Sequence, residues 1–207
     1  MRKFVLLGAA LAFLAAPAAA QNTVPQVGVT SDYLGRTTYS AVWIGLAPAA
    51  STTDLICIAG SSTKTVKVQQ IKLSGSAGTT LSLPVTVLRR ASLDTAGTAA
   101  TTTANPANTI GKRNTNSPTA TATLISYTAN PTINDTSPTY IDSAQLAISL
   151  TTMATVSIPV LFDWAKDIEN FLQPPTLTAA TQQLCVNFNA TSLASGLITG
   201  SITWTEE

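Results

Sequence analysis

Large apolar side chains recur at every second position along much of the chain. From 79 to 90, Leu81, Leu83, Val85 and Val87 alternate with serine, proline and threonine. A period of two places these side chains on one face of a β-strand, unlike the 3.6-residue period of an amphipathic helix. The same pattern predicts strands at 38–46, 54–60, 64–75, 79–90, 120–129, 144–150, 154–164, 182–190 and 197–207.

Turn-rich polar segments separate these predicted strands. About eight to ten short strands with little helix favour an all-β fold, an antiparallel β-sandwich with a jelly-roll-like arrangement. The last strand, 197–207, is expected to be central and packed, with Trp204 in the core.

Irregular positions interrupt the alternation. The apolar phase in 64–75 shifts by one residue near Gln69 and Gln70, which predicts a β-bulge there. Pro84 and Pro159 lie inside predicted strands and cannot donate to a ladder, which indicates edge strands or local breaks. Gly75–Gly78 lies between two predicted strands and is expected to form a hairpin turn.

The N-terminal segment has the pattern of a secretory signal peptide. Arg2 and Lys3 precede an apolar run from 4 to 14, and small residues up to Ala20 suit signal peptidase. A membrane anchor is less favoured, because a spanning helix needs roughly 20 apolar residues. We therefore expect cleavage after Ala20 and export to the periplasm, the extracellular space or a cell or particle surface, with 21–207 forming a single domain.

A long segment from about 91 to 119 contains few large apolar side chains. Connections of this length are uncommon inside compact domains unless they are functional. The segment is therefore expected to be an exposed loop, and a natural place for variable binding contacts.

The chain carries unusually little charge. Asp, Glu, Lys and Arg make up 10% of its 207 residues, against about 25% in a typical globular protein. The formal net charge is +1, so no strong field favours nucleic acid or an anionic membrane surface. The pairs Arg89-Arg90 and Lys112-Arg113 are interpreted as solvated strand ends or loops.

Cys57 and Cys185 are the only cysteines. An oxidising compartment favours their pairing in a disulfide. The alternative is two separate buried thiols that behave as small hydrophobic residues. Their spacing does not resemble a zinc site, and no metal or cofactor is expected.

The sequence offers little catalytic chemistry. It contains no histidine, so Ser-His-Asp and Cys-His arrangements are excluded. Asp163, Asp167 and Glu169 form the densest group of carboxylates, beside Trp164 and Phe171. Such a group could form a sugar or calcium site, but it is more often the solvated face of a short turn.

Several short motifs extend over most of the region after residue 20. They are a "PAASTTDL" segment, a "GSSTKTVKV" strand, an "LRRAS" exit, a Thr/Ala/Asn-rich loop, "YTANPT" and a terminal "WTEE", at Pro48–Leu55, Gly60–Val68, Leu88–Ser92, 91–119, Tyr127–Thr132 and Trp204–Glu207. With these motifs the chain resembles a family of largely uncharacterised phage- and prophage-associated proteins. The resemblance implies a β-sandwich displayed on or near a virion, as a decoration or fibre component, and its motifs are structural.

These observations favour a non-enzymatic exported protein with a structural, surface-display or binding role. We expect it to self-associate, with a trimer as the favoured assembly. The alternative is a secreted carbohydrate-binding module, or less favourably a carbohydrate-cleaving one. There Trp43, Trp164, Tyr127 or Tyr140 would stack on sugar rings, with Trp164 the best candidate for an exposed aromatic residue.

Overall fold

The structure is a computed structural model that describes residues 36–99, 110–150, 155–165, 173–193 and 196–207. The predicted signal peptide and the carboxylates Asp167 and Glu169 lie outside these residues. No described residue belongs to a helix that is long and apolar enough to cross a membrane. The described strands are β1 Thr37–Leu46, β2 Thr52–Ala59, β3 Val66–Ser76, β4 Leu81–Arg90, β5 Thr98–Ala99, β6 Ile110–Lys112, β7 Thr123–Ala129, β8 Thr139–Leu150, β9 Thr155–Ile158, β10 Val160–Asp163, β11 Thr176–Leu177, β12 Gln183–Thr191 and β13 Leu197–Glu206.

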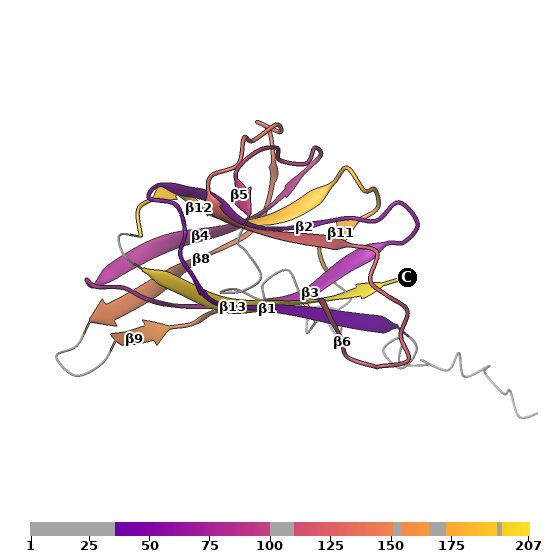
Figure 1. Ribbon diagram of the computed structural model, residues 1–207, viewed down its shortest axis with the longest axis horizontal. Coiled ribbons are helices and arrows are strands. Elements are labelled where there is room, and N and C mark those ends of the chain that lie inside the picture. The colour runs from indigo at the N-terminus through magenta and orange to yellow at the C-terminus, as the bar shows by residue number, and fades with distance from the viewer. Residues whose placement is uncertain (1–35, 100–109, 151–154, 166–172, 194–195) are drawn as a thin grey trace, which may run out of the picture. The chain divides into compact units, whose positions relative to one another are not determined.

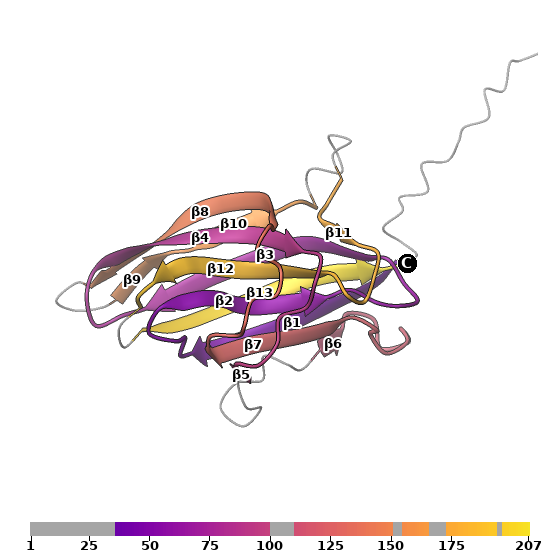
Figure 2. The same ribbon diagram turned by 90° about the horizontal axis from the view of Figure 1, so that it is seen from above.

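These strands form two antiparallel sheets that pack face to face, which confirms the predicted β-sandwich (Figure 1). The six-stranded sheet has the order β10-β3-β13-β1-β6, with β11 paired to β3. The seven-stranded sheet has the order β5-β7-β2-β12-β4-β8-β9. Figure 2 shows the seven-stranded sheet from above, with β2, β12, β4 and β8 side by side.

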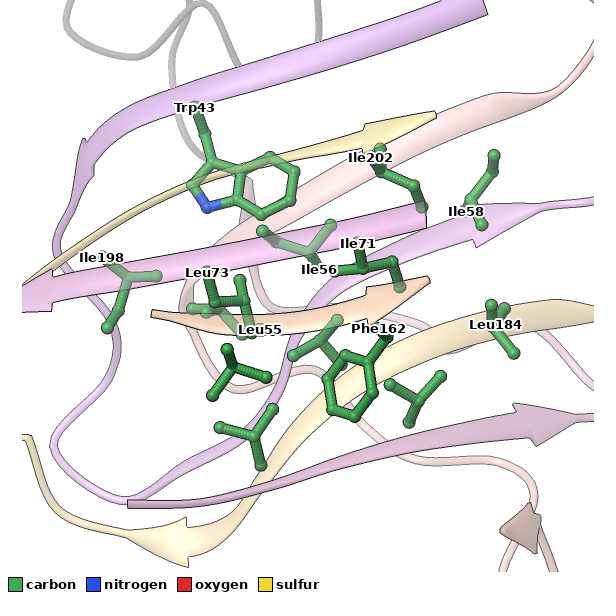
Figure 3. Close-up of a cluster of buried hydrophobic side chains, with 14 of the residues drawn as sticks. Trp43, Leu55, Ile56, Ile58, Ile71, Leu73, Phe162, Leu184, Ile198 and Ile202 are labelled. Atoms are coloured by element: carbon green, nitrogen blue, oxygen red, sulfur yellow. The ribbon is translucent and has the colours of Figure 1, made fainter. Parts of the chain in front are cut away.

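The inward-facing side chains of both sheets form one continuous core (Figure 3). Trp43 on β1 and Trp204 on β13 are fully buried, and β13 lies centrally in its sheet, as predicted. Gly200 on β13 lies opposite Trp43, and a Cβ atom there would approach the indole ring to 2.6 Å. The large aromatic side chain therefore fills the space that the glycine leaves open.

The predicted bulge in β3 is confirmed. Gln70 pairs with Thr203 of β13, whereas the next pair joins Val68 to Trp204, so Gln69 is the additional residue. The extra residue restores the inward orientation of the apolar side chains on both sides of it.

Pro84 does not mark an edge strand, because β4 lies between β12 and β8. The pairing of β4 with β12 ends at Thr86, while its pairing with β8 continues past Pro84 to Leu81. Pro84 therefore lies at a local break, where one side of the strand has lost its partner.

Two connections that look local in the sequence pass between the sheets. The predicted strand 154–164 is divided at Pro159 into β9, in the seven-stranded sheet, and β10, in the six-stranded sheet. The expected hairpin turn at Gly75–Gly78 is wrong for the same reason, because β3 and β4 belong to different sheets. Strands of the two sheets alternate in the same way, so alternation cannot reveal which sheet a strand joins or where the chain crosses between them.

The predicted loop at 91–119 contains two short strands and is not uniformly irregular. Residues 98–99 form β5 beside β7, and residues 110–112 form β6 at the edge of the six-stranded sheet. Small side chains and glycine gave no alternation strong enough to predict either strand.

The side-chain carboxylate of Glu206, the last residue of β13, is buried and accepts several hydrogen bonds. Glu206 accepts hydrogen bonds from the backbone N–H of Thr121 at 2.9 Å, from its hydroxyl at 2.7 Å and from the N–H of Ala122 at 3.0 Å. The indole Nε1–H of Trp204 also donates to it, at 3.2 Å. Burial raises the pKa of Glu206, but these donors outweigh burial and hold the pKa below its ordinary value. Their stabilisation is therefore present above about pH 4.5 and is lost as the pH falls further.

We expect the substitution Glu206→Gln to lower the free energy of unfolding by about 1.5 to 3 kcal/mol, because the carboxamide turns donors toward N–H groups that need an acceptor. Urea denaturation at neutral pH measures the effect. The matched control is Glu207→Gln, at the surface ion pairs with Arg36 and Lys67. Its expected cost is at most about 1 kcal/mol, and equal losses for the two variants would contradict the role assigned to Glu206.

Candidate functional site

Arg89 and Arg90, at the end of β4, project to opposite faces of the seven-stranded sheet. Arg90 follows Leu88 on the outer face and is buried, whereas Arg89 is half-buried on the inner face, where it pairs in register with Leu184 of β12. Arg90 therefore lies beneath the outer face and Arg89 beside the groove described below, although both also line a hollow between them. The interpretation of this pair as solvated strand ends is wrong for Arg90.

A small cap covers Arg90 on the outer face of the seven-stranded sheet. We use this name for residues 91–99 and 129–137, the segments that run above the sheet beside β5 in Figure 1. Thr95 and Thr132 exchange two backbone hydrogen bonds, at 3.0 and 2.7 Å. The side-chain amide of Asn134 donates to the carbonyl oxygen of Leu93 at 2.8 Å.

Arg90 forms a buried ion pair with Asp54 of β2. Its Nε donates to Asp54 Oδ2 at 2.7 Å and its Nη2 to Asp54 Oδ1 at 3.1 Å, a bidentate arrangement. Its Nη1 donates to the carbonyl oxygen of Asp135 in the cap at 2.6 Å. The amide of Asn187 on β12 also donates to Asp54. The guanidinium thus joins β4 to β2 and to the cap, and Asp54 extends the network to β12.

Asp94, in the cap, is a second carboxylate beside this pair, with no accessible side-chain surface. Its Oδ1 lies 3.9 Å from Arg90 Nε, beyond hydrogen-bond distance, and has no hydrogen-bond partner. Burial, and then the neighbouring carboxylate of Asp54, raise the pKa of Asp94 to about 7, although Arg90 opposes the shift. Tyr127 faces the same carboxylates, and burial with their negative charge raises its pKa to about 12.

The cysteines form the disulfide that the sequence predicts. Cys57 of β2 and Cys185 of β12 are directly opposite one another in the ladder, with an S–S distance of 2.08 Å. The bond closes a sequence separation of 128 residues. It lies under the cap among Leu88 and Tyr127, with Asp94 Oδ2 3.8 Å from Cys57 Sγ.

The ionic cluster does not suit a metal ion. Among the described residues, ligand atoms of Asp54, Cys57, Asp94 and Cys185 lie within 4.8 Å of one another. The two sulfur atoms are bonded to each other, however, and thiolates rather than disulfides bind metals. The Arg90 guanidinium already supplies the positive charge that the Asp54 carboxylate needs.

We expect Asp94→Asn to remove a pH dependence of stability. The pKa of Asp94 rises from 3.8 in the unfolded chain to about 7 in the folded protein, so wild-type stability falls as the pH rises through this interval. The asparagine variant keeps a neutral, donating group and should be more stable than wild type at pH 8, with little difference at pH 4. Thermal unfolding across this pH range measures the effect, and parallel pH profiles of the two proteins would contradict it.

A second candidate site is a groove beside Arg89, at one end of the sandwich. Its volume is about 580 Å³. A neighbouring hollow of about 350 Å³ shares Arg89 and Thr176 with it. The groove is lined by Arg89, Ile141, Asp142, Trp164, Gln173, Pro174, Pro175 and Thr176.

The structure places the residues of the predicted aromatic and carboxylate site differently from expectation. The expectation that Trp164 is exposed is wrong: the side chain is 7% exposed and stacks on Phe162 with 5.8 Å between ring centroids. It follows Val160 and Phe162 on the inward phase of β10, and only part of it reaches the groove. Asp163 has the opposite phase and does not line the groove with Trp164, and Asp167 lies outside the described residues.

The other aromatic candidates also differ from one another. Trp43 is buried in the core and Tyr127 is buried beneath the cap, so neither ring is open to a sugar. Tyr140 is 68% exposed on β8. It lines a shallow hollow of about 360 Å³ with Asp142 and is open to solvent on its other side.

Sequence reasoning missed Arg89, Arg90, Asp54 and Asp94 as site residues. One signal was present: Asp54 begins an otherwise apolar strand, and a carboxylate there needs a buried partner. No protein-family model, curated protein or solved structure matches the chain.

Proposed function

We propose that the protein is an exported, non-enzymatic β-sandwich that associates with copies of itself and has a structural or binding role at a surface, such as a decoration or fibre component. The absence of histidine from the whole sequence supports a role without acid–base catalysis near neutral pH. The periplasm, the extracellular space and a cell or particle surface all suit this role.

The observation that carries the proposal is the outer face of the six-stranded sheet. Four of the seven large hydrophobic side chains that are exposed among the described residues lie on this face, which makes it the place where apolar surface gathers. They are Val42 and Ile44 on β1, Leu161 on β10 and Leu197 on β13.

The register of the sheet brings these side chains into one area. Leu161 pairs with Lys72, Lys72 with Ser201 and Ser201 with Val42, so these four residues form one row across the sheet. Serine and threonine occupy most of the remaining outward positions on β13. A face that combines exposed apolar side chains with serine and threonine, and with Lys72 as the one charge in this row, suits contact with a second copy of the chain.

We expect the native mass of the signal-cleaved protein to be a multiple of the chain mass, with a trimer as the favoured state. The double substitution Val42→Glu, Ile44→Glu should shift it to a monomer, because it places carboxylates in the contact. Size exclusion with light scattering measures the mass.

The matched control for this experiment is Ile125→Glu, because Ile125 is 40% exposed on the outer face of the other sheet. This variant should retain the wild-type assembly. A monomeric wild-type protein at high concentration would refute self-association, and dissociation of the Ile125 variant would move the contact to the other sheet.

The groove beside Arg89 favours a second candidate function, carbohydrate binding. It combines apolar walls with hydroxyl, amide and carboxylate groups, the mixture that recognises sugars. Trp164 supplies part of a wall instead of an open stacking platform, because Phe162 stacks on its ring. Binding of saccharides to the purified protein, screened on a glycan array, tests this function.

A further inference from the structure

The groove at the end of the sandwich presents a guanidinium group without an anionic partner. Among the described residues, no carboxylate lies within ion-pair distance of Arg89, whereas Arg36 pairs with Glu207 and Arg90 with Asp54. Arg89 is half-buried and lines both the groove and the hollow beside it. A guanidinium that is partly shielded from water gains strongly from a bidentate anion.

The other residues that line the groove indicate which kind of anion would fit there. Ile141, Pro174 and Pro175 supply apolar surface, while Asp142 and Thr176 supply polar atoms. The volume of about 580 Å³ lies within the range of roughly 300 to 1,000 Å³ that small-molecule sites occupy. A bare inorganic anion would leave most of this lining without contacts.

We propose that the groove binds an acidic saccharide and that Arg89 holds the carboxylate of a uronic acid unit. This inference rests on the second candidate function, carbohydrate binding, and is independent of self-association. The carboxylate accepts two parallel N–H bonds from the guanidinium, and the sugar ring lies against the apolar walls.

Asp142 explains why a hydroxylated acid suits the groove better than a simple carboxylate. Its Oδ1 accepts the backbone N–H of Ser143 at 2.8 Å, which leaves Oδ2 to accept sugar hydroxyl groups. The side chain is exposed, so solvent screens its repulsion of the ligand carboxylate. A saccharide satisfies both charges of the groove, through its carboxylate at Arg89 and its hydroxyl donors at Asp142.

The experiment is a titration of the isotope-labelled protein with digalacturonate, followed by NMR, with neutral galactobiose as the matched ligand. We expect saturable shifts in residues around the groove and at the Arg89 side chain. Galactobiose should bind at least about tenfold more weakly than digalacturonate. A tenfold difference corresponds to the loss of roughly 1.4 kcal/mol of charge-assisted hydrogen bonding.

The substitution Arg89→Gln should weaken digalacturonate binding by about tenfold or more. The matched control is Arg113→Gln, which removes the same charge from an exposed position on the six-stranded sheet and should leave binding unchanged. Thermal unfolding of both variants verifies that they are folded.

Four results would overturn the inference. Equal weakening by the two substitutions would indicate a general charge effect, and shifts confined to another face would place the ligand elsewhere. Binding of galactobiose as tight as that of digalacturonate would refute the acidic ligand while preserving carbohydrate binding. Failure of both ligands and of the glycan array would overturn the second candidate function together with the inference.

Discussion

The two sheets are joined at one end by a carboxylate that has no cationic partner in the part of the chain that the structure describes. Glu206 ends the central strand of the six-stranded sheet, and it accepts backbone N–H groups from the residues that lead into β7 of the seven-stranded sheet. Trp204 donates to the same carboxylate and stacks on Tyr39, so the core is coupled to this end of the sandwich. Because burial costs a charge its hydration, only a complete set of donors makes such a carboxylate stabilising.

Three buried carboxylates in this fold illustrate three degrees of satisfaction. Glu206 accepts hydrogen bonds from neutral donors only. Asp54 accepts hydrogen bonds from a bidentate guanidinium and from an amide. Asp94 meets the same guanidinium only at 3.9 Å, beside a like charge, and its pKa rises accordingly. Asp94 is therefore the carboxylate with the fewest favourable partners of the three. It belongs to the cap, which covers the disulfide.

Alternation in the sequence predicted the long strands and the bulge at Gln69, because both depend on the face to which a side chain points. It could not assign strands to sheets, and so it missed the crossing at Pro159. It also missed the pairing of Asp54 with Arg90. Strict alternation from Cys57 would send Asp54 inward, but the ladder of β2 and β12 shifts register at Leu55 and returns Asp54 to the outer face. Such a shift depends on both strands, so neither strand reveals it alone.

The buried ionic groups also determine the character of the surface. The chain has only 21 charged side chains in total, 11 basic and 10 acidic, and Asp54, Arg90, Asp94 and Glu206 are withdrawn from solvent. Few charged side chains therefore remain for the surface, and the formal net charge of +1 for the whole chain gives little of the repulsion that keeps soluble proteins apart. Such a surface repels a neighbouring molecule only weakly. The ionic groups that stabilise the sandwich from within are therefore also the reason that its exterior carries so few charges.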